Sequence, residues 1–357
     1  MKVAIVYDRV NKWGGAERVL LNLKKIFPDA VLYTSVYDEK KAPWAKEFRV
    51  KTSFLQKFPF AKSTHELFAT LMPISFESFN FDDFDLVISV TSEFSKAVIT
   101  KPQTLHICYC LTPTRYLWSG YDIYFKNSLL RFISAPFVWY LRKFDKVAAF
   151  RPDEMIAISN DVRERIKKYY QRDSRVIFAP VDFPKVDLTK NTGDYFLIVS
   201  RLVSYKKIDL AISAFNKTGF PLKIIGTGGE EKKLKQMAKA NIEFIKNVSD
   251  EELFKYYANS IALVFPGLED FGLTMVEANY FGRPAIAFRG GGALDIVEEG
   301  ISGEFFDQAN AESLIKVLEK FDISLYNEKL CRENALRFSF ANFKNNIKAF
   351  IDKSKNL

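Results

Sequence analysis

The sequence predicts an α/β protein made of two successive doubly wound domains, each built on a parallel sheet. Three observations support this prediction. Short runs rich in Val, Ile and Phe recur along the chain, and most are followed by a glycine or polar turn and then by a helical pattern. The 357 residues are enough for two domains of ordinary size. A stretch rich in Pro, Asp and Lys at 182–192 separates the two series of units and indicates a linker.

The overall composition excludes several classes of protein. Hydrophobic residues make up 48% of the chain and charged residues 27%, which is typical of a folded globular protein and not of a disordered one. The apolar run at the start is too short for a signal peptide, and no segment has the roughly 18 uncharged apolar residues of a membrane span, so we expect a cytoplasmic protein. Three cysteines suggest neither a disulfide framework nor a metal site, and no nucleic-acid-binding motif is present.

The positive charge is concentrated in the first half of the chain. Residues 1–190 contain 30 Lys and Arg against 21 Asp and Glu, whereas residues 191–357 contain 22 of each. A basic first domain suggests an anionic partner or surface. Residues 121–150 interleave large apolar side chains with five Lys and Arg, so this helical segment either packs on its own domain or lies on the anionic inner face of a membrane. Both interpretations remain open at this point.

In the first domain we expect a glycine turn after the first strand. Strands are predicted at 2–7, 30–36, 85–90, 104–110, 155–159 and 176–180. Gly14 and Gly15 follow the first of them and precede a helical pattern, so backbone could approach a ligand closely there. The Asp-x-Asp of Asp83 and Asp85 stands before its strand and not after it, which indicates a solvated turn and not a metal site.

In the second domain we expect charged and glycine-rich loops at strand ends. Strands are predicted at 195–200, 222–225, 242–245, 261–266 and 284–288. Arg201 and Lys206 follow the first strand and precede a helix, and cations in such a place make a phosphate site. Gly226 opens the turn after the second strand, and the glycines at 290–292 are expected to open space for a ligand.

Two glutamates lie near the start of the next predicted helix, one before it and one within it. Glu269 is expected in the loop after a buried strand, and Glu277 about two turns into the following helix. The first amides of that helix, at 272–274, offer N–H groups to an anion such as phosphate. Glutamate pairs at this separation are common by chance in a chain this rich in charge, so the surrounding motifs decide their interpretation.

Five segments together resemble a known family. They are Gly-Gly-x-Glu at 14–17, Thr-Pro-x-Arg-Tyr at 112–116, Arg-Leu-Val-x-x-Lys at 201–206, the Glu269 and Glu277 pair, and Gly-Gly-Ala at 291–293. They resemble the retaining two-domain nucleotide-sugar glycosyltransferases of group 1, also called family 4, and are most similar to its polysaccharide mannosyltransferase-like sub-family. The resemblance covers essentially the whole chain and implies the GT-B fold, in which two Rossmann-like domains face a central cleft.

The resemblance also implies a domain layout. Residues 1–183 would form an N-terminal, acceptor-binding domain and residues 184–192 the linker. Residues 193–340 would bind the nucleotide sugar, and residues 341–357 would form a helix that crosses back to the first domain.

The activity implied is transfer of a hexose, mannose or a 6-deoxyhexose, from a nucleoside diphosphate sugar to a saccharide acceptor with retention at the anomeric carbon. A GDP-linked donor is favoured, the acceptor is expected to be lipid-linked, and no metal or other cofactor is expected. Arg201 and Lys206 would stabilise the leaving diphosphate, and Glu269 would hold the sugar hydroxyls. Glu277 would hold the ribose. The other donor-binding residues implied are Gly14, Gly15, Leu111, Gly226, Phe271, Gly272, Leu273 and Thr274.

Leu111 is a departure from the family pattern. Related sequences usually carry histidine just before Thr-Pro, near the 6-hydroxyl of the donor hexose, and leucine neither donates nor accepts a hydrogen bond. The substitution indicates either reduced activity or a donor that lacks this hydroxyl. Two other functions also remain open: a catalytically idle nucleotide-sugar-binding subunit, and a sugar-nucleotide epimerase of the same fold.

Overall fold

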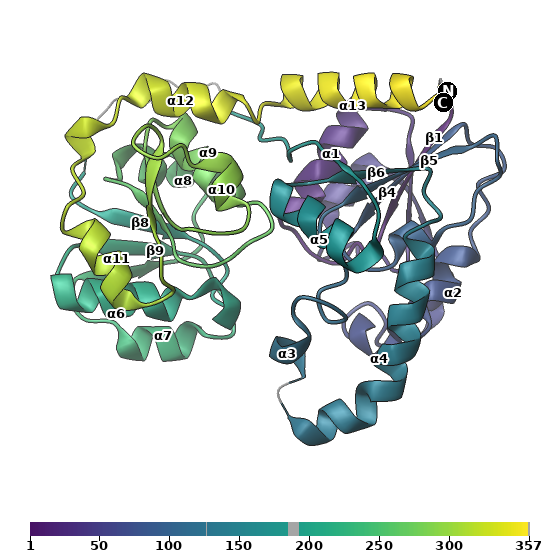
Figure 1. The fold of residues 1–357 in the computed structure, drawn as a ribbon, viewed down its shortest axis with the longest axis horizontal. Coiled ribbons are helices and arrows are strands. Elements are labelled where there is room, and N and C mark those ends of the chain that lie inside the picture. Colours follow the sequence, from purple (N-terminus) through teal and green to yellow (C-terminus); the bar gives the residue numbers. More distant parts are fainter. Residues whose placement is uncertain (126, 185–192, 356–357) are drawn as a thin grey trace. The chain divides into compact units, whose positions relative to one another are not determined.

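A computed structural model describes residues 1–125, 127–184 and 193–355 (Figure 1). The chain forms two compact units: Met1–Pro180 together with Phe343–Leu357, and Val181–Asn342. All of the linker expected at 184–192 except Pro184 lies outside the described residues. Among the described residues, no helix is long and apolar enough to cross a membrane.

The first unit is built on a seven-stranded sheet in the order β3-β2-β1-β4-β5-β6-β7, and every neighbouring pair is parallel. Its central strands consist of continuous apolar runs because both faces of the sheet are covered. The strands are β1 Val3–Tyr7, β2 Val31–Thr34, β3 Arg49–Thr52, β4 Leu86–Thr91, β5 Leu105–Cys110, β6 Glu154–Ala157 and β7 Arg175–Val176.

Helices cover the two faces of this first sheet. On one face, Phe76 of α2 and Leu141 of α4 pack in a buried cluster with Val6 and Val87 of the sheet. On the other face, Phe343 of α13 contacts Tyr109, with ring centroids 6.0 Å apart. The helices of this unit are α1 Gly15–Ile26, α2 Met72–Glu77, α3 Tyr121–Tyr124, α4 Ser128–Ala148, α5 Asn160–Tyr170 and α13 Phe340–Ser354, with short 3₁₀ turns η1 Pro43–Glu47, η2 Phe54–Lys57, η3 His65–Phe68 and η4 Ser95–Ala97.

The second unit is built on a six-stranded parallel sheet in the order β10-β9-β8-β11-β12-β13. Helices α6, α7 and α11 lie on one face of this sheet and α8, α9 and α10 on the other (Figure 1). The strands are β8 Phe196–Val199, β9 Leu222–Ile225, β10 Ile242–Ile245, β11 Leu263–Phe265, β12 Ala285–Phe288 and β13 Gly303–Phe306. The helices are α6 Ile208–Thr218, α7 Glu231–Met237, α8 Asp250–Asn259, α9 Leu273–Tyr280, α10 Ala293–Ile296, α11 Ala311–Leu318 and α12 Glu328–Leu336, with 3₁₀ turns η5 Ser204–Lys206 and η6 Ile323–Leu325.

Each sheet has a topological switch point, where the strand order reverses. It lies between β1 and β4 in the first unit and between β8 and β11 in the second. In open α/β sheets, ligands bind beyond the carboxyl ends of the strands at this place. The segments that follow these four strands are therefore the ones to inspect for function.

Candidate functional site

An ion pair marks the switch point of the second sheet. Lys206, in η5 after β8, pairs through Nζ with Oε1 of Glu269, in the loop after β11. The side chain of Lys206 is 11% exposed and that of Glu269 is 21% exposed. The fold thus holds a cation and a carboxylate together at the carboxyl edge of the sheet, largely shielded from water.

Arg201 lies beside this pair. It is exposed, and its guanidinium donates a hydrogen bond of 2.5 Å to the hydroxyl of Tyr205. Nζ of Lys206 lies 5.4 Å from the centroid of the Tyr205 ring. Tyr205 therefore contacts both cations, although sequence reasoning assigned it no role.

Glycines after β9 allow its loop to pack against the segment that carries Arg201. Gly226 has φ +147°, and a Cβ there would lie 1.9 Å from the carbonyl oxygen of Ser200. A Cβ on Gly228 would lie 2.3 Å from the carbonyl oxygen of Leu202. Backbone hydrogen bonds close the same contact, since Leu202 N–H donates to Thr227 at 2.9 Å. These glycines fix the position of the Arg201 segment.

The glycines after β12 hold the loop that carries Glu269. The N–H of Gly292 donates to the carbonyl oxygen of Glu269 at 2.9 Å, and a Cβ on Gly292 would lie 2.2 Å from the carbonyl oxygen of Phe271. Gly291 has φ +60°, and a Cβ there would lie 2.3 Å from the Glu269 carbonyl oxygen. At Gly291 and Gly292 the absent Cβ admits the neighbouring backbone, and the expectation that the glycines at 290–292 open space for a ligand stays a prediction. Phe271 is buried and packs edge-on against Phe338.

Helix α9 begins beside the ion pair. Gly272 is its N-cap with φ +114°, and the amides of Leu273 and Thr274, in its first turn, have no acceptor within the helix. Glu277 is the fifth residue of α9, so it lies little more than one turn in and not two as expected. Its Oε2 accepts a 2.7 Å hydrogen bond from the hydroxyl of buried Tyr257, a partner that the sequence did not indicate.

The second unit therefore gathers most of the predicted site residues near one edge of its sheet. Cations and a helix N-terminus suit an anion such as a diphosphate, and the carboxylates suit hydroxyl groups. In the described part of the chain, no group of three His, Cys, Asp or Glu is placed to hold a metal ion. The residues gathered are Arg201, Lys206, Gly226, Glu269, Phe271, Gly272, Leu273, Thr274 and Glu277.

The remaining predicted residues belong to the first unit. Gly14 is the N-cap of α1 in an extended conformation, and Gly15 is the first residue of that helix. A Cβ on Gly14 would lie 3.2 Å from Oε2 of Glu17, a buried carboxylate that accepts a 2.7 Å hydrogen bond from the hydroxyl of Tyr7. Leu111 follows β5 and is only 8% exposed, and its N–H donates to the carbonyl oxygen of Thr91 at 2.8 Å.

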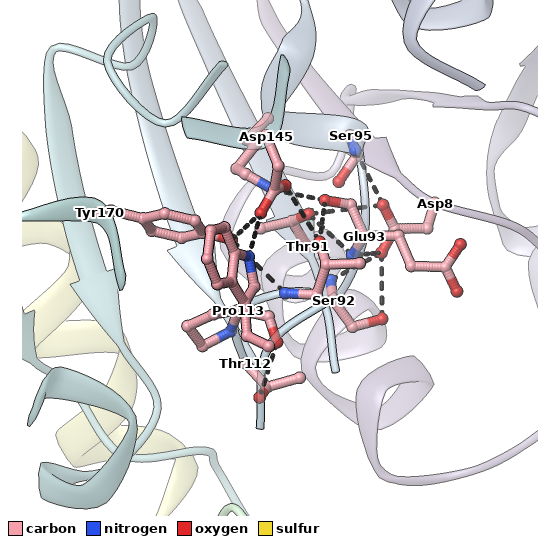
Figure 2. A network of polar contacts seen from close by, with 12 residues as sticks. Asp8, Thr91, Ser92, Glu93, Ser95, Thr112, Pro113, Asp145 and Tyr170 are labelled. Carbon is pink, nitrogen blue, oxygen red and sulfur yellow. Dashed lines mark hydrogen bonds and ion pairs between the residues drawn. The ribbon is translucent and has the colours of Figure 1, made fainter. Parts of the chain in front are cut away.

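A buried carboxylate holds the loop after β4. Asp8, at the end of β1, accepts backbone hydrogen bonds from Ser92 at 2.6 Å, Glu93 at 3.0 Å and Ser95 at 2.8 Å (Figure 2). Glu93 in turn forms an ion pair with Arg9. Burial raises the pKa of Glu93, and the neighbouring Arg9 opposes that rise. The switch point of the first sheet is thus lined by charged groups that hold one another in place.

A second buried carboxylate holds the loop after β5. Asp145 of α4 is fully buried and accepts hydrogen bonds from Tyr170 at 2.8 Å, Thr114 at 3.0 Å and the indole of Trp118 at 2.7 Å (Figure 2 labels Asp145 and Tyr170). It also pairs with Lys96. Sequence reasoning missed this network, although one signal was available: Asp145 is the sole acidic residue in the apolar and basic helix α4.

Comparison with known proteins matches the second unit to a glycosyltransferase family. The family model described as Glycosyl transferases group 1 matches residues 182–335. An uncharacterized glycosyltransferase of Haemophilus influenzae is 24% identical over 335 residues, covering 89% of each chain. An uncharacterized glycosyltransferase of Methanocaldococcus jannaschii is 30% identical over 209 residues, 56% of this chain. That match spans 58% of the archaeal relative's own length.

Solved structures share the fold over nearly the whole chain. The lipopolysaccharide outer core galactosyltransferase WaaB in its apo form has a TM-score of 0.70 at 19% identity and covers 99% of both chains. Anabaena HepE in complex with UDP and glucose has a TM-score of 0.72 at 17% identity and covers 99% of this chain and 100% of its own. The chain thus has the GT-B fold. The match to the group 1 glycosyltransferase family model covers residues 182–335, which belong to the second unit.

Proposed function

We propose that this protein is a retaining hexosyltransferase that moves a sugar from a nucleoside diphosphate to a saccharide acceptor. The observation that carries the proposal is the Lys206 and Glu269 ion pair at the switch point of the second sheet, beside the N-terminus of α9. A diphosphate and its attached sugar need a cation and a hydrogen-bond acceptor as close neighbours, and this pair supplies both.

The chemistry follows from the charge that develops during transfer. Breaking the bond between the anomeric carbon and the phosphate oxygen places negative charge on the leaving diphosphate, which Arg201, Lys206 and the first amides of α9 would stabilise. When the diphosphate engages Lys206, the Glu269 carboxylate is released to accept hydrogen bonds from the sugar hydroxyls. No side chain is assigned as a covalent nucleophile, so the acceptor hydroxyl attacks on the face from which the diphosphate departs and passes its proton to the departing phosphate oxygen.

The donor is proposed to be GDP-linked, because the segment at 112–118 resembles the mannosyltransferase-like sub-family. The sugar is proposed to be mannose or a 6-deoxyhexose. HepE, which shares the fold, was crystallised with UDP and glucose, which supports a nucleotide site of this kind in a GT-B protein without fixing the base. We further propose a lipid-linked saccharide acceptor at the inner membrane face, in polysaccharide or glycoconjugate biosynthesis, because the first half of the chain carries all the excess positive charge.

The test is transfer of labelled sugar by the purified protein. Arg201→Ala and Lys206→Ala should each lower turnover by about 10²–10³-fold, the range found when one charge-stabilising donor is removed. Activity should survive EDTA, since side chains and a helix terminus take the place of a metal. Loss in EDTA that manganese restores would contradict the metal-independent mechanism. Product analysis separates the alternatives, because an epimerase converts the donor without an acceptor and an idle subunit converts nothing.

A further inference from the structure

The exposed surface of helix α4 is unusual for a helix in contact with water. Seven large apolar side chains on it are between 42% and 82% exposed. Successive residues turn by about 100° in an α-helix, so these seven fall within a sector about 160° wide. We call these seven residues the apolar face of α4; the exposed side chain of Lys143 projects within the same sector. They are Leu129, Phe132, Ile133, Phe137, Trp139, Tyr140 and Val147.

The opposite side of α4 is buried against its own unit. Val138, Leu141, Asp145 and Ala148 are buried and lie on the side that packs on the first sheet. The helix is therefore apolar on two sides, and a helix of this kind is normally covered on both. Large contiguous apolar patches are rare on soluble proteins and mark a surface that binds a partner or a membrane.

Charge identifies the partner. The basic residues of α4 are Arg131, Arg142, Lys143 and Lys146, and its sole acidic residue, Asp145, is buried. Lys143 and Lys146 are exposed, and Nζ of Lys143 lies 5.5 Å from the centroid of the Trp139 ring. Long basic side chains beside aromatic rings place their apolar parts among lipid tails and their charges at anionic headgroups.

We propose that the apolar face of α4 inserts into the surface layer of an anionic lipid bilayer. The helix does not span the membrane; it lies in the plane of the interface with Phe132, Phe137 and Trp139 between the acyl chains. The first half of α4 extends away from the sheet of its unit (Figure 1), and the side chains of Phe132, Phe137 and Trp139 are each more than half exposed. The proposal goes beyond transfer of a sugar and beyond attraction by charge alone, because an inserted apolar face should hold the protein at high salt.

The experiment measures flotation of the full chain with vesicles of phosphatidylcholine that contain phosphatidylglycerol, at 0.05 M and 0.5 M NaCl. Wild type should bind at both salt concentrations, with a blue shift of tryptophan fluorescence. Phe132→Ser combined with Phe137→Ser should lower the partition coefficient by about 10²-fold at both, because two aromatic side chains no longer leave water. Lys143→Gln combined with Lys146→Gln should weaken binding at low salt only.

A matched control uses exposed apolar residues elsewhere. Leu325 is 75% exposed and Leu330 is 44% exposed, both in the second unit, so Leu325→Ser combined with Leu330→Ser removes comparable apolar surface and should leave flotation unchanged. The proposal is overturned if wild type does not bind vesicles, if its binding disappears at 0.5 M NaCl, or if the control weakens binding as much as the Phe variant does. A wild-type dimer in solution that Phe132→Ser and Phe137→Ser dissociate, without vesicle binding, would assign the face to a second copy.

Discussion

The Nζ atom of Lys96 lies 2.6 Å from Oδ1 of Asp145, and both side chains are almost completely buried. Burial alone would lower the pKa of Lys96, but the Asp145 carboxylate keeps it above its usual value. Hydrogen bonds from Thr114, Trp118 and Tyr170 satisfy the rest of the carboxylate. The pair thus joins α4 to η4 in the segment after β4, and the hydrogen bonds from Thr114 and Trp118 join α4 to the loop after β5.

Breaking this pair should destabilise the first unit. Asp145→Asn leaves the Lys96 ammonium buried without a counter-charge, and we expect a loss of about 3–5 kcal/mol in the free energy of unfolding. Urea unfolding monitored by circular dichroism measures it. Asp173→Asn is the control, because the Asp173 carboxylate pairs with Lys167 at the surface and its loss should have no measurable effect. Equal midpoints for Asp145→Asn and wild type would contradict the prediction.

Stability should fall in acid because of His106. Burial, with further contributions from Arg172 and Arg151, lowers the pKa of His106 from 6.5 to about 3. The unfolded chain therefore binds a proton below about pH 6.5 that the folded chain does not bind until about pH 3, so stability is lost as the pH falls through this window. His106→Gln should reduce the slope of the free energy of unfolding against pH by up to about 1.4 kcal/mol per pH unit. Urea titrations between pH 4 and pH 8 test this, and identical slopes for the two proteins would refute it.

Two adjacent glycines provide a matched test of the donor site. A Cβ on Gly228 would lie 2.3 Å from the carbonyl oxygen of Leu202, whereas a Cβ on Gly229 would meet nothing within 4 Å. Gly228→Ala should displace the segment that carries Arg201 and weaken nucleotide binding at least about tenfold, since misplacing one charged contact costs upwards of about 1.4 kcal/mol. Gly229→Ala should bind as wild type does. Isothermal titration calorimetry with GDP and UDP measures both variants, and equal affinities would show that the loop contact does not position the site.

Tyr257→Phe should weaken nucleotide binding modestly. The variant keeps the ring, which stacks on Phe281, and removes the hydroxyl that donates to Glu277. Loss of one neutral donor to Glu277, which we propose orients the ribose, corresponds to about 1 kcal/mol, or roughly fivefold in affinity. The same titration shows whether affinity changes. A normal Kd for Tyr257→Phe would mean that Glu277 does not need this hydroxyl for its orientation.

Leu111 should influence the choice of donor sugar. A methyl group of a 6-deoxy sugar could pack against leucine, whereas a buried hydroxyl without a partner costs about 1–3 kcal/mol. We therefore expect wild type to prefer a GDP-6-deoxyhexose to GDP-mannose, and Leu111→His to shift the ratio of kcat/KM values toward mannose. Competition between the two labelled donors measures this ratio. A tenfold preference of wild type for GDP-mannose would contradict the role given to Leu111.

The central strands and their loops could be predicted from sequence because their signals are local. The run that ends in β11, the loop with Glu269 and the start of α9 are contiguous, so the apolar pattern and the glycine locate them directly. The edge strands β3 and β13 were not predicted. In β3 every second residue is exposed, so a sequence of Arg, Val, Lys and Thr lacks the continuous apolar signal of a buried parallel strand.

The partners of the site residues could not be predicted from sequence because they come from distant segments. Tyr257 precedes Glu277 by 20 residues and lies on another helix. Lys96 precedes Asp145 by 49 residues. No periodicity within either segment signals such a contact, and only the packing of the whole unit brings the atoms together. The local chemistry of Arg201, Lys206 and Glu269 could be inferred, but the pairing of Lys206 with Glu269 could not.

Pro136 gives α4 a mechanical property. Proline has no N–H to donate to the carbonyl oxygen of Phe132, so the helix is interrupted between its projecting half and the half that Asp145 fastens to the sheet, and Figure 1 shows α4 bent along its length. We expect the missing hydrogen bond at Pro136 to let the projecting half tilt relative to the half that Asp145 fastens. Movement of the projecting half on a lipid surface would then not be transmitted to the loop after β5.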